Sequence, residues 1–150
     1  MAIVKVISGG QTGIDRIGLE VAKGHGLPTG GWAAKDFMTE AGPDPMLKYF
    51  GLVEHSSDRY PPRTRANVRD SDGTVWFGEG DSRGKMCTLR AAEDYGKPFL
   101  NNPTAYTLKA WMRTHGILVL NVAGNRGSKL TLETETAARA VLTEALQNGK

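Results

Sequence analysis

The stretch from Ser8 to Arg16 reads Ser-Gly-Gly-Gln-Thr-Gly-Ile-Asp-Arg and carries the clearest chemical signal in the sequence. Because glycine has no β-carbon, an oxyanion can approach the backbone of such a stretch closely. If a helix follows, its first N–H groups are unpaired and its dipole adds partial positive charge. We therefore predict an anion-binding turn, with a tight turn that binds nothing as the alternative. The residues predicted to contact the anion are Gly9, Gly10, Gln11, Thr12, Gly13 and Arg16.

The neighbouring residues predict that this stretch joins a strand to a helix. Residues 3–7 are apolar and rich in β-branched side chains, which favours a buried strand. Ile14, Ile17 and Val21 follow at helical spacing, and glycines end the helix near residues 23–26. The turn is neither the dinucleotide-binding G-x-G-x-x-G pattern nor a P-loop, whose Lys-Ser/Thr pair is missing. Within this turn, we expect the substitution Gly10→Val to block anion binding sterically and to leave the fold mostly intact.

Two further polar turns follow predicted strands. Residues 78–85 come after the strand 73–77, and residues 123–129 come after the almost wholly apolar strand 117–122. Right-handed crossovers bring the carboxyl ends of parallel strands to one edge of a sheet, so the three turns should share a site. The residues predicted to bind the ligand there are Arg83, Gly84, Lys85, Asn121, Gly124, Asn125, Arg126 and Ser128.

A basic helix supplies the remaining predicted contacts. Residues 60–70 predict a helix that begins at its two prolines and carries Arg63 and Asn67 on one face. We predict that both close over the ligand, with Arg63 making a bidentate contact to a phosphate. A solvated basic helix is the alternative interpretation. Lys35 and Asp72 complete the predicted set.

Strands and helices alternate along the chain, which predicts an α/β domain with a parallel sheet covered on both faces. The other predicted strands are residues 27–33 and 99–101, and the other helices are residues 86–95, 104–115 and 132–146. Residues 34–57 show little periodicity, and such long irregular segments are commonly functional. A length of 150 residues predicts a single domain spanning 1–150.

Composition excludes several classes of function. The formal charge of +3 is too small and too dispersed to predict nucleic-acid binding. The single cysteine, Cys87, suits a reducing cytoplasm, and we interpret it as a small packing residue. No stretch has transmembrane length, and the first residues lack a signal-peptide pattern, so we expect a cytoplasmic protein without membrane contact. No metal site is expected from the histidines, which are His25, His55 and His115.

Four ordered motifs, at residues 8–16, 31–32, 63–74 and 120–128, resemble the putative molybdenum cofactor carrier family. This family is a circularly permuted branch of the SLOG superfamily, whose members bind nucleotides and related small molecules. The resemblance spans nearly the whole chain. It implies a Rossmann-like three-layer fold with a mostly parallel central sheet, a ligand site built from the glycine turns, and a homo-oligomer, either a dimer or a tetramer.

The same relatedness includes the lysine-decarboxylase-like phosphoribohydrolases, whose hallmark is P-G-G-x-G-T-x-x-E. In this chain only Gly84 and Thr88 match that hallmark, and a basic residue or alanine replaces its carboxylate. We therefore predict a carrier, sensor or sequestering protein for an anionic small molecule, such as molybdenum cofactor or a nucleotide derivative, with no catalytic residue. The alternative is a nucleotide N-glycosidase whose acid or base is one of Asp15, Glu40, Asp70 and Asp72.

Overall fold

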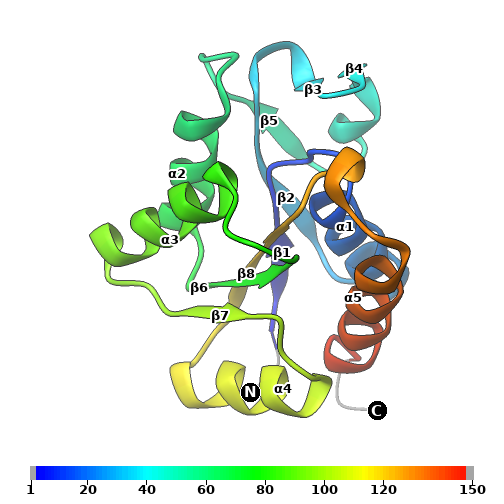
Figure 1. Cartoon of the computed structure of the whole chain (residues 1–150), viewed down its shortest axis with the longest axis vertical. Coiled ribbons are helices and arrows are strands. Elements are labelled where there is room, and N and C mark those ends of the chain that lie inside the picture. Colours follow the sequence, from blue (N-terminus) through cyan, green and yellow to red (C-terminus); the bar gives the residue numbers. More distant parts are fainter. Residues whose placement is uncertain (1–2, 148–150) are drawn as a thin grey trace.

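A six-stranded sheet forms the centre of the computed structural model, which describes residues 3–147 (Figure 1). Every neighbouring pair of its strands is parallel. The order across the sheet is β5 (Leu52–Glu54), β2 (Thr29–Ala33), β1 (Lys5–Ile7), β8 (Val119–Gly124), β6 (Gly73–Phe77) and β7 (Phe99–Asn101). The predicted parallel α/β sheet is confirmed.

Helices cover both faces of this sheet (Figure 1). On one face lie α1 (Ile14–Gly24), α4 (Ala105–His115) and α5 (Leu132–Ala145), with α5 packed against the other two. On the other face, α2 (Tyr60–Asp70) packs against α3 (Arg83–Tyr95). The predicted Rossmann-like three-layer arrangement is therefore confirmed. Within residues 3–147, no helix has the length and apolar character needed to cross a membrane.

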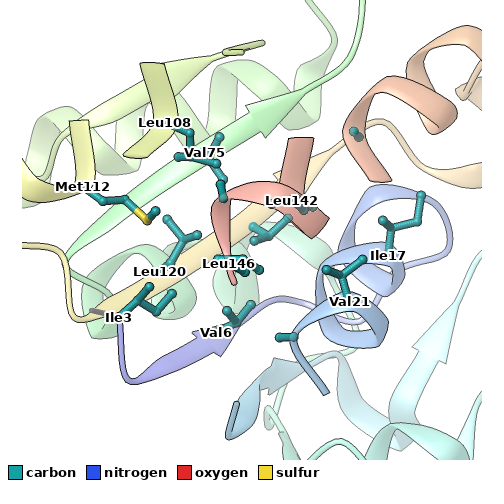
Figure 2. Close-up of a cluster of buried hydrophobic side chains, with 14 of the residues drawn as sticks. Ile3, Val6, Ile17, Val21, Val75, Leu108, Met112, Leu120, Leu142 and Leu146 are labelled. Atoms are coloured by element: carbon teal, nitrogen blue, oxygen red, sulfur yellow. The ribbon is translucent and has the colours of Figure 1, made fainter. Parts of the chain in front are cut away.

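The main hydrophobic core lies between the sheet and the layer of α1, α4 and α5. Figure 2 shows Val6, Val75 and Leu120 of the sheet facing side chains from these helices. Leu108 and Leu142, from α4 and α5, are fully buried against them. The apolar spacing that predicted α1 and α5 therefore marks the face that each buries, whereas the predicted stripe of α4 included Tyr106, which is exposed. The opposite face of the sheet has a smaller apolar cluster under α2 and α3, which leaves room there for polar side chains.

Helix α3 begins at Arg83, three residues before the predicted start at Met86. The side chain of Ser82 accepts a hydrogen bond from the backbone N–H of Lys85, which caps the helix there. The residues from Arg83 to Lys85, predicted as part of a polar loop, therefore form the first helical turn. Their backbone is fixed by the helix rather than free to fold around a ligand.

Residues 34–57, here called the hairpin segment, hold short elements that periodicity did not predict. They are η1 (Lys35–Phe37), the antiparallel pair β3 (Met38–Thr39) and β4 (Gly42–Pro43), η2 (Pro45–Lys48) and the edge strand β5. A second apolar cluster anchors the segment to α1 and β2 through Phe37, Leu47, Phe50 and Leu52. Elements of two to four residues are too short for a periodic signal, so sequence alone could not reveal them.

Gly10 packs beneath the hairpin segment. Its φ is +74°, and a β-carbon there would lie 2.8 Å from methyl carbons of both Leu47 and Leu52. The expectation that Gly10→Val leaves the fold mostly intact is therefore wrong, because the added side chain would displace two core leucines.

We expect Gly10→Ala to lower the free energy of unfolding by about 2–4 kcal/mol, from backbone strain plus overpacking. Gly26→Ala is the matched control, because Gly26 has a φ of +76° and open space around its α-carbon. Its loss should be about 1–2 kcal/mol, from strain alone. Urea denaturation measures both variants, and equal losses would contradict the packing assigned to Gly10.

Candidate functional site

A cleft of about 850 Å³ opens at the carboxyl ends of β1, β8 and β6, on the face covered by α2 and α3. Its place at the carboxyl edge of a parallel sheet is where open α/β folds bind ligands. The predicted residues that line it are Gly9, Gln11, Arg63, Asn67, Arg83, Gly84, Asn121, Gly124, Asn125 and Arg126. The structure thus brings residues from all three polar turns and from the basic helix to one cavity.

Arg63 is the most distinctive cation of the cleft. It is only 8% exposed, its guanidinium stacks over the ring of Tyr60, and it lies against the backbone of Gly9. Its Nη1 donates to Oγ1 of Thr64 at 3.3 Å and lies 3.7 Å from Oδ2 of Asp15. Within residues 3–147, its Nε and Nη2 donate to no acceptor. A nearly buried guanidinium with unused donors is suited to binding an oxyanion.

The amides of the first glycine turn are occupied by the protein itself. The N–H of Gly10 donates to Oγ of Ser8 at 3.2 Å, and the N–H of Gln11 donates to Oδ2 of Asp15 at 3.2 Å. The N–H of Thr12 donates to Oε1 of Gln11 at 3.0 Å. The expectation of unpaired amides in this turn is wrong for these donors, because a buried backbone N–H without a partner is costly.

Asp15 supplies the anion that this turn holds. Its side chain is buried, and burial raises its pKa from 3.8 to about 6, although Arg63 and the turn amides partly offset that effect. Asp15 also lines the cleft. The sequence assigned it no ligand contact, since a helix-start aspartate is ordinarily explained by the helix dipole.

Glu40, from the hairpin segment, binds polar groups of the third polar turn in a similar way. Its carboxylate accepts hydrogen bonds from the N–H and the Oγ of Ser128, at 2.8 and 2.6 Å, and from Oγ1 of Thr12. These hydrogen bonds, those from Ser128 above all, lower the pKa of Glu40. Nε of Arg126 lies 3.5 Å from the same carboxylate. Ser128 and Thr12 therefore fasten the hairpin segment and do not line the cleft.

Two predicted ligand contacts have structural roles. Asn67 is fully buried, and its amide accepts from the N–H of Trp32 at 2.8 Å and donates to the carbonyl of Trp32 at 3.0 Å. Asp72 accepts from the N–H groups of Leu118 and Val119 at the amino end of β8. Asp72 lies at the edge of the sheet opposite the cleft, so its assignment as a ligand contact is wrong.

The other predicted residues also lie away from the cleft lining. Arg16 pairs with Asp44 in a separate hollow of about 450 Å³, which Thr12 and Gly13 also line. Lys85 pairs with Asp81, and Lys35 is exposed in η1. Gly10 packs beneath the hairpin segment, and none of these residues lines the cleft.

The cleft also contains residues that the sequence did not single out. Tyr60 and Trp76 supply aromatic surface, and Lys129 supplies a further cation. Trp76 shares a strand face with Thr74, which bonds Asn121, so strand alternation was the signal that could have placed it here. Cys87 lines the cleft half-buried, and burial raises its pKa, which disfavours a thiolate. Within residues 3–147, no three His, Cys, Asp or Glu side chains lie together in a way that could hold a metal ion.

Comparison with known proteins places this chain in a family. The sequence model of the circularly permutated YpsA SLOG family matches residues 6–146. The chain belongs to this family. It is 38% identical to a protein from Syntrophus aciditrophicus SB whose crystal structure is described as a putative molybdenum carrier protein. That match has a TM-score of 0.86 and covers 97% of this chain and 96% of the other. No functionally curated protein matches the chain.

We expect Asn67→Ala to lower the free energy of unfolding by about 2–3 kcal/mol, because it leaves backbone groups of Trp32 without partners. Arg65→Ala is the control on the same helix, since its ion pair with Asp94 is exposed and should contribute less than about 1 kcal/mol. Urea denaturation compares the two, and equal effects would contradict the structural role of Asn67.

Asp15→Asn should change how stability depends on pH. Because the folded pKa is raised from 3.8 to about 6, wild-type stability falls as pH rises through this interval and stays lower above it. Relative to the wild type, Asp15→Asn should gain up to about 3 kcal/mol between pH 4 and pH 7. Thermal unfolding across pH measures the difference. Exposed Asp58→Asn is the control, and a pH-independent difference for Asp15→Asn would contradict the buried charge.

Proposed function

We propose that this chain is a small-molecule binding protein, acting as a carrier, sensor or sequestering protein for a phosphate-bearing ligand. Molybdenum cofactor and nucleotide derivatives are the ligand classes that fit. The observation that carries the proposal is Arg63, a nearly buried cation with free donors in a large cleft. Membership of a SLOG family and the similarity to a protein described as a molybdenum carrier support a ligand-binding role.

The charges around Arg63 favour an anionic group. Arg83, Arg126 and Lys129 also line the cleft, giving four cationic side chains with Arg63. The carboxylates that line it are three, Asp15, Glu79 and Asp81. Asp15 faces Arg63, and Asp81 pairs with Lys85. The guanidinium of Arg63 can hold two oxygens of one phosphate through its Nε and Nη2 groups. This is the contact on which the assignment depends.

The size and lining of the cleft suit a ligand larger than a bare phosphate. Its volume of about 850 Å³ falls in the upper part of the range for small-molecule sites. Tyr60 and Trp76 offer aromatic surface for a planar heterocycle. Cys87 is the one thiol of the chain, so molybdenum cofactor would be bound through its phosphate and ring system rather than through its metal.

One observation favours a hydrolase as the second candidate. Asp15 is a cleft carboxyl whose pKa of about 6 suits a general acid or base near neutral pH. A nucleotide N-glycosidase of this kind would release free base from nucleoside monophosphates. Incubation with these substrates separates the candidates, because turnover that Asp15→Asn abolishes would replace the binding proposal.

The domain extent, cellular location, oligomeric state and partner class expected from the sequence are part of this proposal. We infer a single ligand-binding domain over residues 1–150 that works in the cytoplasm as a homo-oligomer, either a dimer or a tetramer. Its partner is an anionic small molecule rather than a nucleic acid or a membrane, in keeping with a formal charge of only +3.

We expect Arg63→Met to weaken ligand binding tenfold or more, because about 1.5–3 kcal/mol of charge-assisted hydrogen bonding is lost. Small molecules released from the purified wild-type protein are identified by mass spectrometry, and the phosphate-bearing compound found is titrated back by calorimetry. Arg65→Met is the matched control, two residues away on α2 and outside the cleft. Equal affinities for the two variants would contradict the site.

A further inference from the structure

Asp15 and Arg63 stand at the same part of the cleft and are both close to the place where an anion would bind. Oδ2 of Asp15 lies 3.7 Å from Nη1 of Arg63, and the two residues are 5% and 8% exposed. An oxyanion on the free Nε and Nη2 of Arg63 would be a near neighbour of the Asp15 carboxylate. Two negative charges so close together in a water-poor site repel strongly.

Nothing else that faces Asp15 neutralises this repulsion. From the turn after β1, the N–H of Gln11 donates to Oδ2 of Asp15 and the N–H of Gly9 also faces this carboxylate, and both amides carry only partial charge. On α1 itself, Arg16 and Glu20 are turned toward Asp44 and Arg139. The other charged residues that line the cleft do not pair with Asp15 within the described chain: Arg83 from α3, Glu79 and Asp81 after β6, and Arg126 and Lys129 after β8.

We propose that a bound anion competes with the Asp15 carboxylate for Arg63, so that Asp15 takes up a proton as the anion enters. This inference deepens the proposed function and rests on it, because it requires Arg63 to be the anion receptor. It makes Asp15 the residue that sets the pH range in which the cleft binds anions.

The direction of the pH dependence follows from linkage. If the anion favours protonated Asp15, then protonation of Asp15 favours the anion by the same factor. Burial already raises the pKa of Asp15 to about 6, so its proton is available slightly below neutral pH. Below that pKa the affinity should be constant. Above it, the affinity should fall by up to about tenfold for each pH unit.

The test uses sulfate as the probe, because sulfate does not titrate near neutral pH. In protein labelled with ¹³C at the aspartate carboxyl carbons, NMR follows each carboxyl from about pH 4 to about pH 8 in chloride or in sulfate at equal ionic strength. We expect sulfate to raise the pKa of Asp15 by about one unit or more, and to leave exposed Asp58 unchanged. In Arg63→Met, sulfate should no longer shift Asp15.

Affinity measured against pH provides the second arm. Wild-type affinity for sulfate should fall steeply above about pH 6, whereas Asp15→Asn, which stays neutral, should bind with an affinity independent of pH. If Asp15→Asn does not fold, the NMR titration of the Asp15 carboxyl in the wild type still tests whether sulfate raises its pKa. An unchanged or lowered Asp15 pKa in sulfate, or a wild type that binds no sulfate at any pH tested, would overturn the proposal.

The outcomes separate this inference from the proposed function. If Arg63→Met loses the phosphate-bearing ligand and sulfate leaves the Asp15 pKa unchanged, the proposed binding site is supported. The proposed competition between the anion and Asp15 is then wrong. If Arg63→Met binds the ligand as the wild type does, the proposed function fails, and the competition for Arg63 fails with it.

Discussion

The buried Asp15 carboxylate is the constraint on which the cleft at the carboxyl edge of the sheet depends. It holds the N–H of Gln11 in the glycine turn and lies 3.7 Å from the guanidinium of Arg63 on α2. One side chain at the start of α1 therefore connects the turn after β1 with the opposite wall of the cleft. Because the carboxylate is desolvated, its negative charge keeps a cation close by, and Arg63 is that cation.

Glu40 shows that this arrangement recurs in the molecule. It fixes the hairpin segment to the turn after β8 through Ser128 and to the first turn through Thr12. Glycine turns of this kind usually predict a phosphate site with unpaired backbone N–H groups. In this chain internal carboxylates and other side chains accept hydrogen bonds from several of their backbone N–H groups, so the cleft relies on side-chain donors, among them Nε and Nη2 of Arg63. The turns shape the cleft, and its positive charge comes from cationic side chains of α2, of α3 and of the segment after β8.

Sequence reasoning predicted the fold well where the signal was local. Apolar periodicity identified α1, α4 and α5, local sequence patterns identified α2, α3 and five of the six sheet strands, and crossover handedness placed the polar turns at one edge. It failed where a role depends on a partner far away in sequence. Asn67 binds the backbone of Trp32, Asp72 accepts from the amides of Leu118 and Val119, and no spacing rule reveals either contact. The packing around Gly10 has no sequence signal for the same reason, since the leucines against it come from the aperiodic hairpin segment.

The most direct measurement of the central claim is the ¹⁵N NMR signal of each arginine Nε–H, followed while the proposed phosphate-bearing ligand is added. The account predicts that the Arg63 signal shifts most and slows its exchange with water, because its free Nε–H acquires an acceptor. Arg139, in the separate hollow, should not respond. A ligand-dependent shift at Arg139 with an unchanged Arg63 signal would contradict the account.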